Sequence, residues 1–228
     1  MTASASRRRF LMRLGCISSA AAACSIPTVC AWAAGTHTPV VVSFSWFENV
    51  NPAELAKTRI DATTGASLLN HGLTTRAAAW IAEEFELAHI VLRTLSPYPA
   101  DYDQCLDQAI EEKTNRTLPR LQPISDRNRR ALGQAELIYL VFPNWSYTLP
   151  RSLASFFADN AIDGKTIAPL CVHGTGGLAR TIADMRRMLP HSRILNPLSL
   201  EREEVLAAQA EILQIGRASC RERVFRAV

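Results

Sequence analysis

The sequence predicts an α/β domain built on a doubly wound, five-stranded parallel sheet with strand order 2-1-3-4-5. Three observations lead to this fold class. Along residues 34–214, segments rich in β-branched residues alternate with segments of helical apolar spacing. The first strand segment, 38–46 (TPVVVSFSW), is a continuous β-branched and aromatic run, which is typical of a strand covered on both faces. Five strand–helix units follow one another, and right-handed crossovers between parallel strands then place helices on both sides of the sheet.

The individual elements follow from local patterns. The expected strands are residues 38–46, 89–95, 136–142, 166–173 and 193–197. The expected helices are residues 75–85, 101–113, 149–158, 178–189 and 201–214. Helix 101–113 is expected to turn Tyr102, Leu106, Ala109 and Ile110 inward. Pro150 falls in the first turn of helix 149–158, where its missing N–H is tolerated.

The charge distribution argues against a nucleic-acid partner. The chain carries a formal net charge of +4, but the excess lies at the two ends. Residues 34–214 hold 17 basic and 20 acidic residues. A domain that is slightly acidic offers no basic surface for a phosphate backbone.

The cysteines predict neither a disulfide framework nor a metal cluster. Of the six cysteines, only Cys105 and Cys171 lie within residues 34–214, and both are expected to be small buried side chains. The aspartates of the domain lack the spacing with histidine that metal ligation requires. We therefore expect no metal site.

Residues 1–33 have the layout of an export signal. A basic start precedes an apolar run of small residues, and Ala31-Trp32-Ala33 forms a small-x-small cleavage site. Ser6–Met12 (SRRRFLM) resembles the twin-arginine (Tat) motif, which implies a periplasmic or other extracytoplasmic location. A plain secretory signal, an anchor helix or a lipoprotein signal at Cys24 are the alternatives. The apolar run is short and weak for a membrane span, so no stable span is expected after cleavage.

Residues 215–228 (IGRASCRERVFRAV) resemble the conceptual translation of a sequencing adapter. The helical spacing of Val205, Gln209 and Ile212 is expected to stop at Gln214. We interpret the segment as an aberrant tail, the alternative being a genuine basic tail. The organisation predicted is a signal at 1–33, one domain at 34–214 and this tail.

The candidate ligand site lies where strands one, three and four end. In a doubly wound sheet, ligands bind outside the carboxyl ends of the strands at the switch point of the strand order. The segments there combine hydroxyl groups, aromatic rings and glycines. The candidate residues are Ser45, Trp46, Thr74, Thr75, Pro143, Asn144, Trp145, Ser146, Tyr147, His173, Gly174, Thr175, Gly176 and Gly177.

Several segments in order carry a resemblance to a known family. They are Ser43-Phe44-Ser45, Ser96–Tyr102 (SPYPADY), Phe142–Trp145 with Thr148–Pro150, Gly164–Thr166, and Cys171–Gly174. Over residues 39–200 the chain resembles the flavodoxin-like family of flavodoxins and FMN-dependent quinone reductases, and most closely its short bacterial flavodoxin-4 branch. The resemblance implies FMN as cofactor. The chain departs from the family pattern at two places. Relatives usually have Gly-Asn-Thr before the first helix, where this chain has Leu73 in place of the asparagine. They often have Trp-Trp-Gly after the third strand, where this chain has Trp145-Ser146-Tyr147.

The candidate residues suit FMN on physical grounds as well. A phosphate binds to hydroxyls and to the N-terminus of a helix, as Ser45, Thr74 and Thr75 would provide. The flavin ring stacks on aromatic residues such as Trp145 and Tyr147, and the glycines of 174–177 allow the backbone to approach it. The structural alternatives are that the threonines cap a helix, that Trp145 anchors its loop, that the glycines form a tight turn, and that His173 is a satisfied strand-end histidine.

The sequence favours an exported FMN protein that transfers electrons or reduces a quinone-like acceptor. The flavin would carry out the electron chemistry, and no protein nucleophile or acid–base pair is expected. The alternative is a module of the same fold that has lost FMN and serves a partner or another small ligand. A hydrolase is disfavoured because no Gly-x-Ser-x-Gly motif is present. The insertion at 48–71 is expected to form a lid or a partner surface.

Overall fold

The computed structural model of the chain describes residues 38–58, 68 and 72–224, with side chains to residue 217. The predicted signal at 1–33 and half of the insertion at 48–71 (residues 59–67 and 69–71) lie outside these residues. The part of the insertion that is described contains the short helices η1 (Phe47–Asn49) and α1 (Pro52–Leu55).

The sheet confirms the predicted class and strand order. Its strands β1 (Val40–Ser43), β2 (Ala88–Val91), β3 (Leu137–Pro143) and β4 (Thr166–His173) are all parallel, in the order β2-β1-β3-β4. The expected last strand, 193–197, is a strand only at its first two residues, and a further strand that was not predicted follows it. Both β5 (Arg193–Ile194) and β6 (Leu198–Glu201) pair with β4, β5 near its start and β6 near its end.

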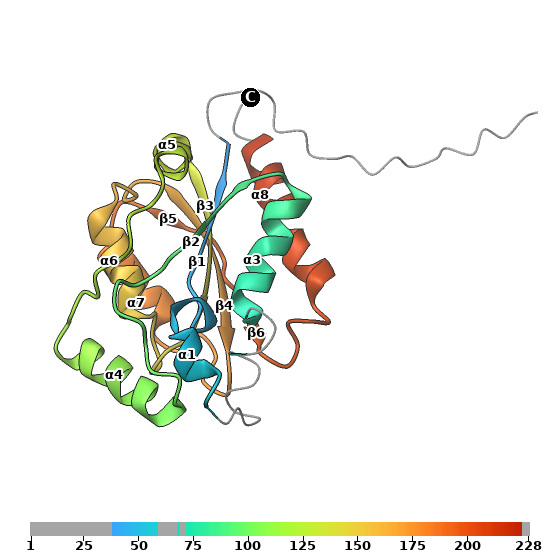
Figure 1. Cartoon of the computed structure of the whole chain (residues 1–228). Coiled ribbons are helices and arrows are strands. Elements are labelled where there is room, and N and C mark those ends of the chain that lie inside the picture. The colour runs from blue at the N-terminus through green and yellow to red at the C-terminus, as the bar shows by residue number, and fades with distance from the viewer. Residues whose placement is uncertain (1–37, 59–67, 69–71, 225–228) are drawn as a thin grey trace, which may run out of the picture. The chain divides into compact units, whose positions relative to one another are not determined.

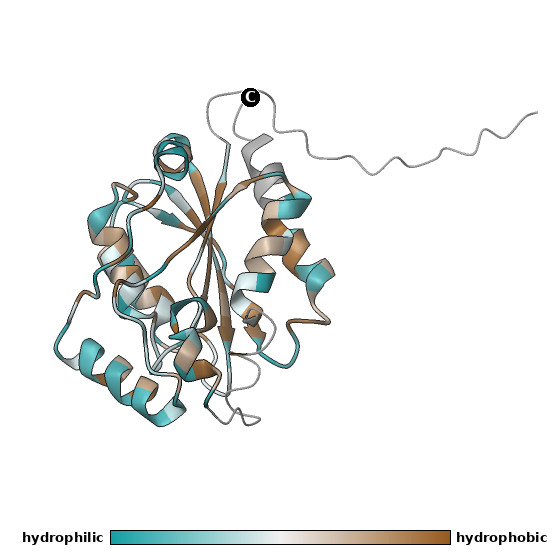
Figure 2. Ribbon diagram, viewed as in Figure 1, coloured by the Kyte–Doolittle hydropathy of each residue, from teal (hydrophilic) through white to brown (hydrophobic). Residues whose placement is uncertain are grey.

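Helices cover both faces of the sheet (Figure 1). One face carries α3 (Leu73–Glu84) and α8 (Gln209–Val224). The other carries α5 (Asp126–Gln134), α6 (Arg151–Asp159) and α7 (Thr181–Met188), with α4 (Tyr102–Thr114) beside α6. Figure 2 shows the apolar colouring concentrated on the strands and on the helix faces turned toward them.

The pleat of the strands divides the core into two layers. Val40 and Val42 of β1 pack on the α5–α7 side, whereas Val41 packs on the α3 side. β3 alternates in the same way, with Tyr139 on the α3 side and Leu140 opposite. Both faces of each central strand are buried, so the apolar runs in the sequence reflect burial on two sides.

Three local expectations were wrong. Helix α5 was not predicted because its sequence, DRNRRALGQ, contains only two apolar residues, of which Leu132 is buried. Pro150 is the N-cap of α6, one position before the first turn. Tyr102 and Ile110, which were expected to turn inward, are exposed, and the buried residues of α4 are Cys105, Ala109 and Glu112.

The C-terminal helix also differs from the expectation. α8 begins at Gln209 and continues past Gln214 to Val224. Ile215 packs on the α3-side core, and the Tyr139 hydroxyl donates to the Gly216 carbonyl oxygen at 3.4 Å. A Cβ atom at Gly216 would overlap the Phe85 ring, so a larger residue there would require the ring to shift. The start of the predicted tail is therefore packed, while its interpretation as adapter sequence stays a prediction.

Candidate functional site

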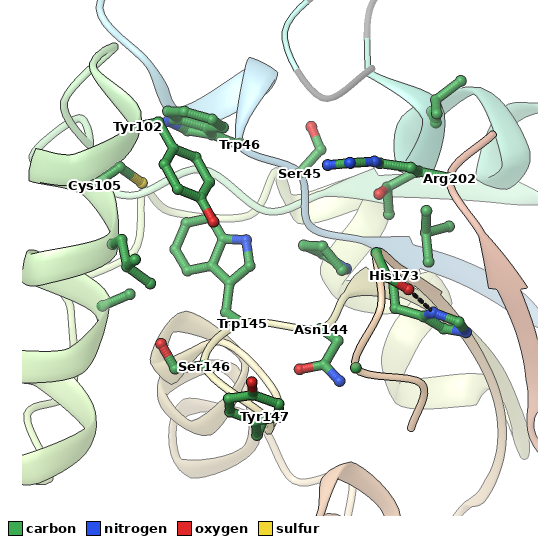
Figure 3. Close-up of a pocket in the computed structure, with 18 of the residues that line it drawn as sticks. Ser45, Trp46, Tyr102, Cys105, Asn144, Trp145, Ser146, Tyr147, His173 and Arg202 are labelled. Atoms are coloured by element: carbon green, nitrogen blue, oxygen red, sulfur yellow. Dashed lines mark hydrogen bonds between the residues drawn. The ribbon is translucent and has the colours of Figure 1, made fainter. Parts of the chain in front are cut away.

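A cavity of about 460 Å³ opens at the carboxyl ends of β1, β3 and β4. This volume falls in the range of about 300–1,000 Å³ that is usual for small-molecule sites. Figure 3 shows side chains from the loops after β1, β3 and β4 converging on it, with α4 along one wall. Of the fourteen residues predicted from the sequence, twelve line this cavity, all except Thr75 and Gly177.

Thr75 and Gly177 lie just behind the wall and hold two lining residues. The Thr75 hydroxyl donates to the Ser45 hydroxyl oxygen at 2.9 Å. The Asn144 side-chain amide donates to the Gly177 carbonyl oxygen at 2.5 Å. These contacts fix the orientation of two polar groups that face the cavity.

The loop after β1 is held by a buried asparagine. The side-chain amide of Asn49 donates to the carbonyl oxygens of Ser45 at 2.8 Å and Leu92 at 3.0 Å. Its side-chain oxygen accepts from the Thr94 backbone N–H at 2.6 Å. Asn49 thus ties the end of β1 to the end of β2. This contact fixes the backbone from which Ser45 projects.

The N-terminus of α3 lies at the same end of the cavity as Ser45. Gly72, the N-cap, has a φ of 64°, a conformation that favours glycine. Leu73 and Thr74 of the first turn line the cavity, and the Thr74 side chain is buried. The first N–H groups of a helix have no partner within it, and they attract anions. Hydroxyls and a helix N-terminus therefore meet at this end.

Trp145 lies at the boundary between the cavity and the core. Its ring lines the cavity and is also packed edge to face against Phe44, at 5.3 Å between ring centroids, and Tyr98, at 4.9 Å. Trp46 is buried nearby, and its indole N–H donates to the Pro99 carbonyl oxygen at 2.9 Å. The aromatic wall is therefore anchored in the core, which makes it rigid.

The residues that follow Trp145 form a tight turn of unusual conformation. Trp145 and Thr148 exchange two backbone hydrogen bonds of 2.9 and 3.0 Å. Between them Ser146 and Tyr147 have φ angles of 48° and 65°. Two positive φ angles in a two-residue turn usually require glycine or asparagine. Tyr147 stands where the family pattern has glycine, and its backbone still adopts the left-handed conformation that glycine favours.

His173 is held by both ring nitrogens. Nδ1 lies 2.6 Å from the Gly174 carbonyl oxygen, and Nε2 lies 2.8 Å from the Ser199 hydroxyl. A carbonyl oxygen only accepts, so in the neutral ring Nδ1 donates and Nε2 accepts from Ser199. This arrangement fits the structural alternative, a satisfied histidine that orients the loop after β4.

Sequence reasoning missed part of the cavity wall. α4 contributes Tyr102, Cys105, Leu106 and Ala109. Their spacing of i, i+3, i+4 and i+7 marks one helix face, but spacing alone does not distinguish a face on the core from a face on a cavity. Leu73, Val172 and Arg202 were also missed.

The electrostatics of the wall are simple. Arg202 is the only lysine, arginine, aspartate or glutamate among the described lining residues. Burial raises the pKa of the Cys105 thiol to about 12, so this thiol stays protonated at neutral pH.

Within the described part of the chain, no cluster of three histidine, cysteine, aspartate or glutamate residues could hold a metal. No helix of the same residues is long and apolar enough to cross a membrane.

Comparison with known proteins supports the family. The profile of the family described as flavodoxin (Flavodoxin_4) matches residues 66–206. A candidate flavoprotein of Bacteroides uniformis is similar in structure, with a TM-score of 0.55, 20% identity, and coverage of 75% of this chain and 96% of that one. A candidate flavoprotein of Bacteroides eggerthii has a TM-score of 0.52, 16% identity, and coverage of 77% and 97%. Among curated proteins none matches the sequence. Given the profile match and the observed strand order, the chain belongs to the flavodoxin family.

Proposed function

We propose that the protein binds FMN in the cavity at the carboxyl ends of β1, β3 and β4 and uses it in redox chemistry. One observation carries the proposal. A single cavity of about 460 Å³ joins an end built for an anion, with Ser45, Thr74 and the first turn of α3, to a wall of fixed aromatic rings. FMN has this same division into a phosphate and a flat ring system.

The residues present fit the cofactor. The hydroxyls of Ser45 and Thr74 and the N–H groups of the first turn of α3 would hold the phosphate. Trp145 would stack on the ring, and Tyr147, which lies 3.5 Å from a Cβ atom built on Gly176, would border the ring together with the loop after β4. Membership of the flavodoxin family and the two candidate flavoproteins of similar fold support this assignment.

The flavin, when bound, supplies the electron chemistry, and the protein binds it, orients it and limits its contact with water. We assign no residue as an acid, base or nucleophile. His173 is engaged through both ring nitrogens, and the Cys105 thiol is held protonated by burial. The reaction we propose is electron transfer to a redox partner or reduction of a quinone-like acceptor.

Export is the second part of the proposal. The twin-arginine pattern at Arg7-Arg8 is typical of proteins that cross the membrane already folded, which suits a domain that must bind its cofactor first. Replacing both arginines with lysine should retain the protein in the cytoplasm. Unchanged export of this variant would exclude the twin-arginine route.

The alternative, a module of this fold without flavin, has one observation in its favour. Leu73 lines the anion end of the cavity, where it offers its backbone N–H but no polar side chain. The absorption spectrum of the purified full chain distinguishes the two functions. The proposal predicts flavin bands and release of FMN on denaturation. A colourless chain that takes up no FMN on incubation would support the alternative.

A further inference from the structure

The anion end of the cavity contains a cation that the sequence pattern did not reveal. The Arg202 side chain is 28% exposed and lines the cavity. Its guanidinium carbon would lie 3.9 Å from a Cβ atom built on Gly174. In Figure 3 the guanidinium points toward Ser45.

The fold fixes this position through β6. The strand pairs with the end of β4, placing Leu200 beside Val172 and Glu201 beside His173. The next residue, Arg202, donates its backbone N–H to the His173 carbonyl oxygen at 2.9 Å. Its side chain therefore starts at the rim of the cavity.

The acidic neighbour of the guanidinium lies outside the cavity. Arg202 Nε lies 2.7 Å from Glu203 Oε1. Glu203 is 64% exposed and does not line the cavity, so solvent screens its charge more than that of the half-buried Arg202.

We propose that Arg202 recognises the phosphate of the flavin and makes the cavity selective for FMN over riboflavin. The inference rests on the proposed function. The flavin ring is neutral, whereas a phosphate dianion matches the guanidinium in charge and geometry. Arg202 also supplies a polar group at the end of the cavity where Leu73 has none.

The test compares two ligands that differ only in the phosphate. Dissociation constants of FMN and riboflavin are measured by quenching of flavin fluorescence on the full apo-protein. Arg202→Gln should weaken FMN by about 10- to 50-fold and riboflavin by less than about threefold, because a charge-assisted hydrogen bond to phosphate is lost. The FMN affinity of Arg202→Lys should lie between those of the wild type and Arg202→Gln, since lysine keeps the positive charge but lacks the planar group that donates two parallel hydrogen bonds.

A matched control removes the neighbouring carboxylate. Glu203→Gln should leave FMN affinity within about threefold of the wild type, since it keeps the guanidinium. Raising the salt concentration should weaken FMN binding more in the wild type than in Arg202→Gln. Urea unfolding of each apo-variant establishes that it is folded.

The outcomes separate this inference from the proposed function. Equal losses for both flavins in Arg202→Gln, or no loss for FMN, would overturn the role of Arg202 while flavin binding stands. A wild-type protein that binds riboflavin as tightly as FMN would also overturn it. A wild-type protein that binds neither flavin would overturn the proposed function itself.

Discussion

The Thr148 hydroxyl donates a 2.5 Å hydrogen bond to the Asp184 carboxylate, and so joins the turn after β3 to α7. Asp184 is buried and also pairs with Arg180 and Arg187. The backbone N–H of Arg180 donates to the Tyr147 carbonyl oxygen at 3.1 Å. The turn that forms one wall of the cavity is therefore held from outside by the start of α7.

We expect Asp184→Ala to lower both stability and flavin affinity. It leaves the buried Thr148 hydroxyl without its acceptor, which costs about 1–3 kcal/mol in free energy of unfolding. The turn carrying Trp145 and Tyr147 then loses an anchor. Urea unfolding and FMN titration measure the two effects. Asp159→Ala, at an exposed aspartate at the end of α6, is the matched control and should change neither. Full stability of Asp184→Ala would contradict this role.

The left-handed conformation of Tyr147 predicts a stabilising substitution. A positive φ costs a non-glycine residue about 1–2 kcal/mol, and this side chain is 68% exposed. Tyr147→Gly should therefore raise the free energy of unfolding of the apo-protein by about 1 kcal/mol, while weakening flavin binding through loss of the ring.

Tyr147→Ala is the informative comparison, because alanine loses the ring but keeps the unfavourable φ. Thermal unfolding should place Tyr147→Gly above the wild type and Tyr147→Ala at or below it. If the two variants had equal stability, backbone strain at this position would not be the cause.

His89 on β2 should make stability depend on pH. Burial lowers the pKa of this histidine from 6.5 to about 4, and Ser43 Oγ lies 2.8 Å from its Nε2. A folded-state pKa below the unfolded one gives stability that is complete above about pH 6.5 and is lost as the pH falls toward about 4. The loss is about 3 kcal/mol if the shift is realised in full.

His89→Gln removes this titration. Urea unfolding at several pH values should show that the difference between wild type and variant changes across this window and is constant above it. The comparison with the variant is needed because Glu112 acts in the opposite direction. Burial raises the pKa of its carboxyl, so its contribution to stability is lost as pH rises. Parallel profiles for wild type and His89→Gln would contradict the assignment.

The start of the C-terminal segment should contribute to stability. Deleting residues 215–228 removes Ile215 from the core, the acceptor of the Tyr139 hydroxyl at Gly216, and the 3.1 Å ion pair of Arg217 with Glu84. We expect a loss of about 2 kcal/mol, mainly from the buried hydroxyl and the apolar contact. Deleting only 218–228 keeps all three contacts and is the control. Denaturant unfolding that gave equal stability for both truncations would show that these contacts contribute nothing.

Much of the fold could be predicted from the sequence because the central strands are buried on both faces. The predicted strand 166–173 coincides with β4, because its interior from Ile167 to Val172 is buried and forms one apolar run. Helix α5 was missed because its polar sequence buries only Leu132. β6 was missed because it depends on pairing with the end of β4, which local patterns do not encode.

The part of the candidate site formed by loops of distinctive residue composition could be predicted from the sequence. The part placed by pairing between distant strands could not. The hydroxyls, aromatic residues and glycines after β1, β3 and β4 indicated the cavity, because parallel strands end at one edge. Arg202 reaches it only through the pairing of β6 with β4, so an arginine among charged neighbours gave no signal. The left-handed turn was also unpredictable, since neither Ser146 nor Tyr147 favours it.

Thr74 and Trp145 should have separable effects on flavin binding. Thr74→Ala should weaken FMN by about 1.5–3 kcal/mol, the range for a hydrogen bond to a charged group, and riboflavin much less. Trp145→Ala should weaken both ligands similarly, because the ring is common to them. Fluorescence titration of each variant with each flavin gives the four affinities. Equal losses for the two flavins in Thr74→Ala would remove the phosphate assignment.

The central claim is that this flavodoxin-family chain binds FMN, and a stoichiometric titration tests it most directly. Full-length apo-protein, at a concentration well above the expected dissociation constant, is added to FMN while flavin fluorescence is followed. The account predicts quenching that ends at one protein per FMN, with absorption bands of bound flavin. Fluorescence that stays unchanged to a large excess of folded protein would contradict it.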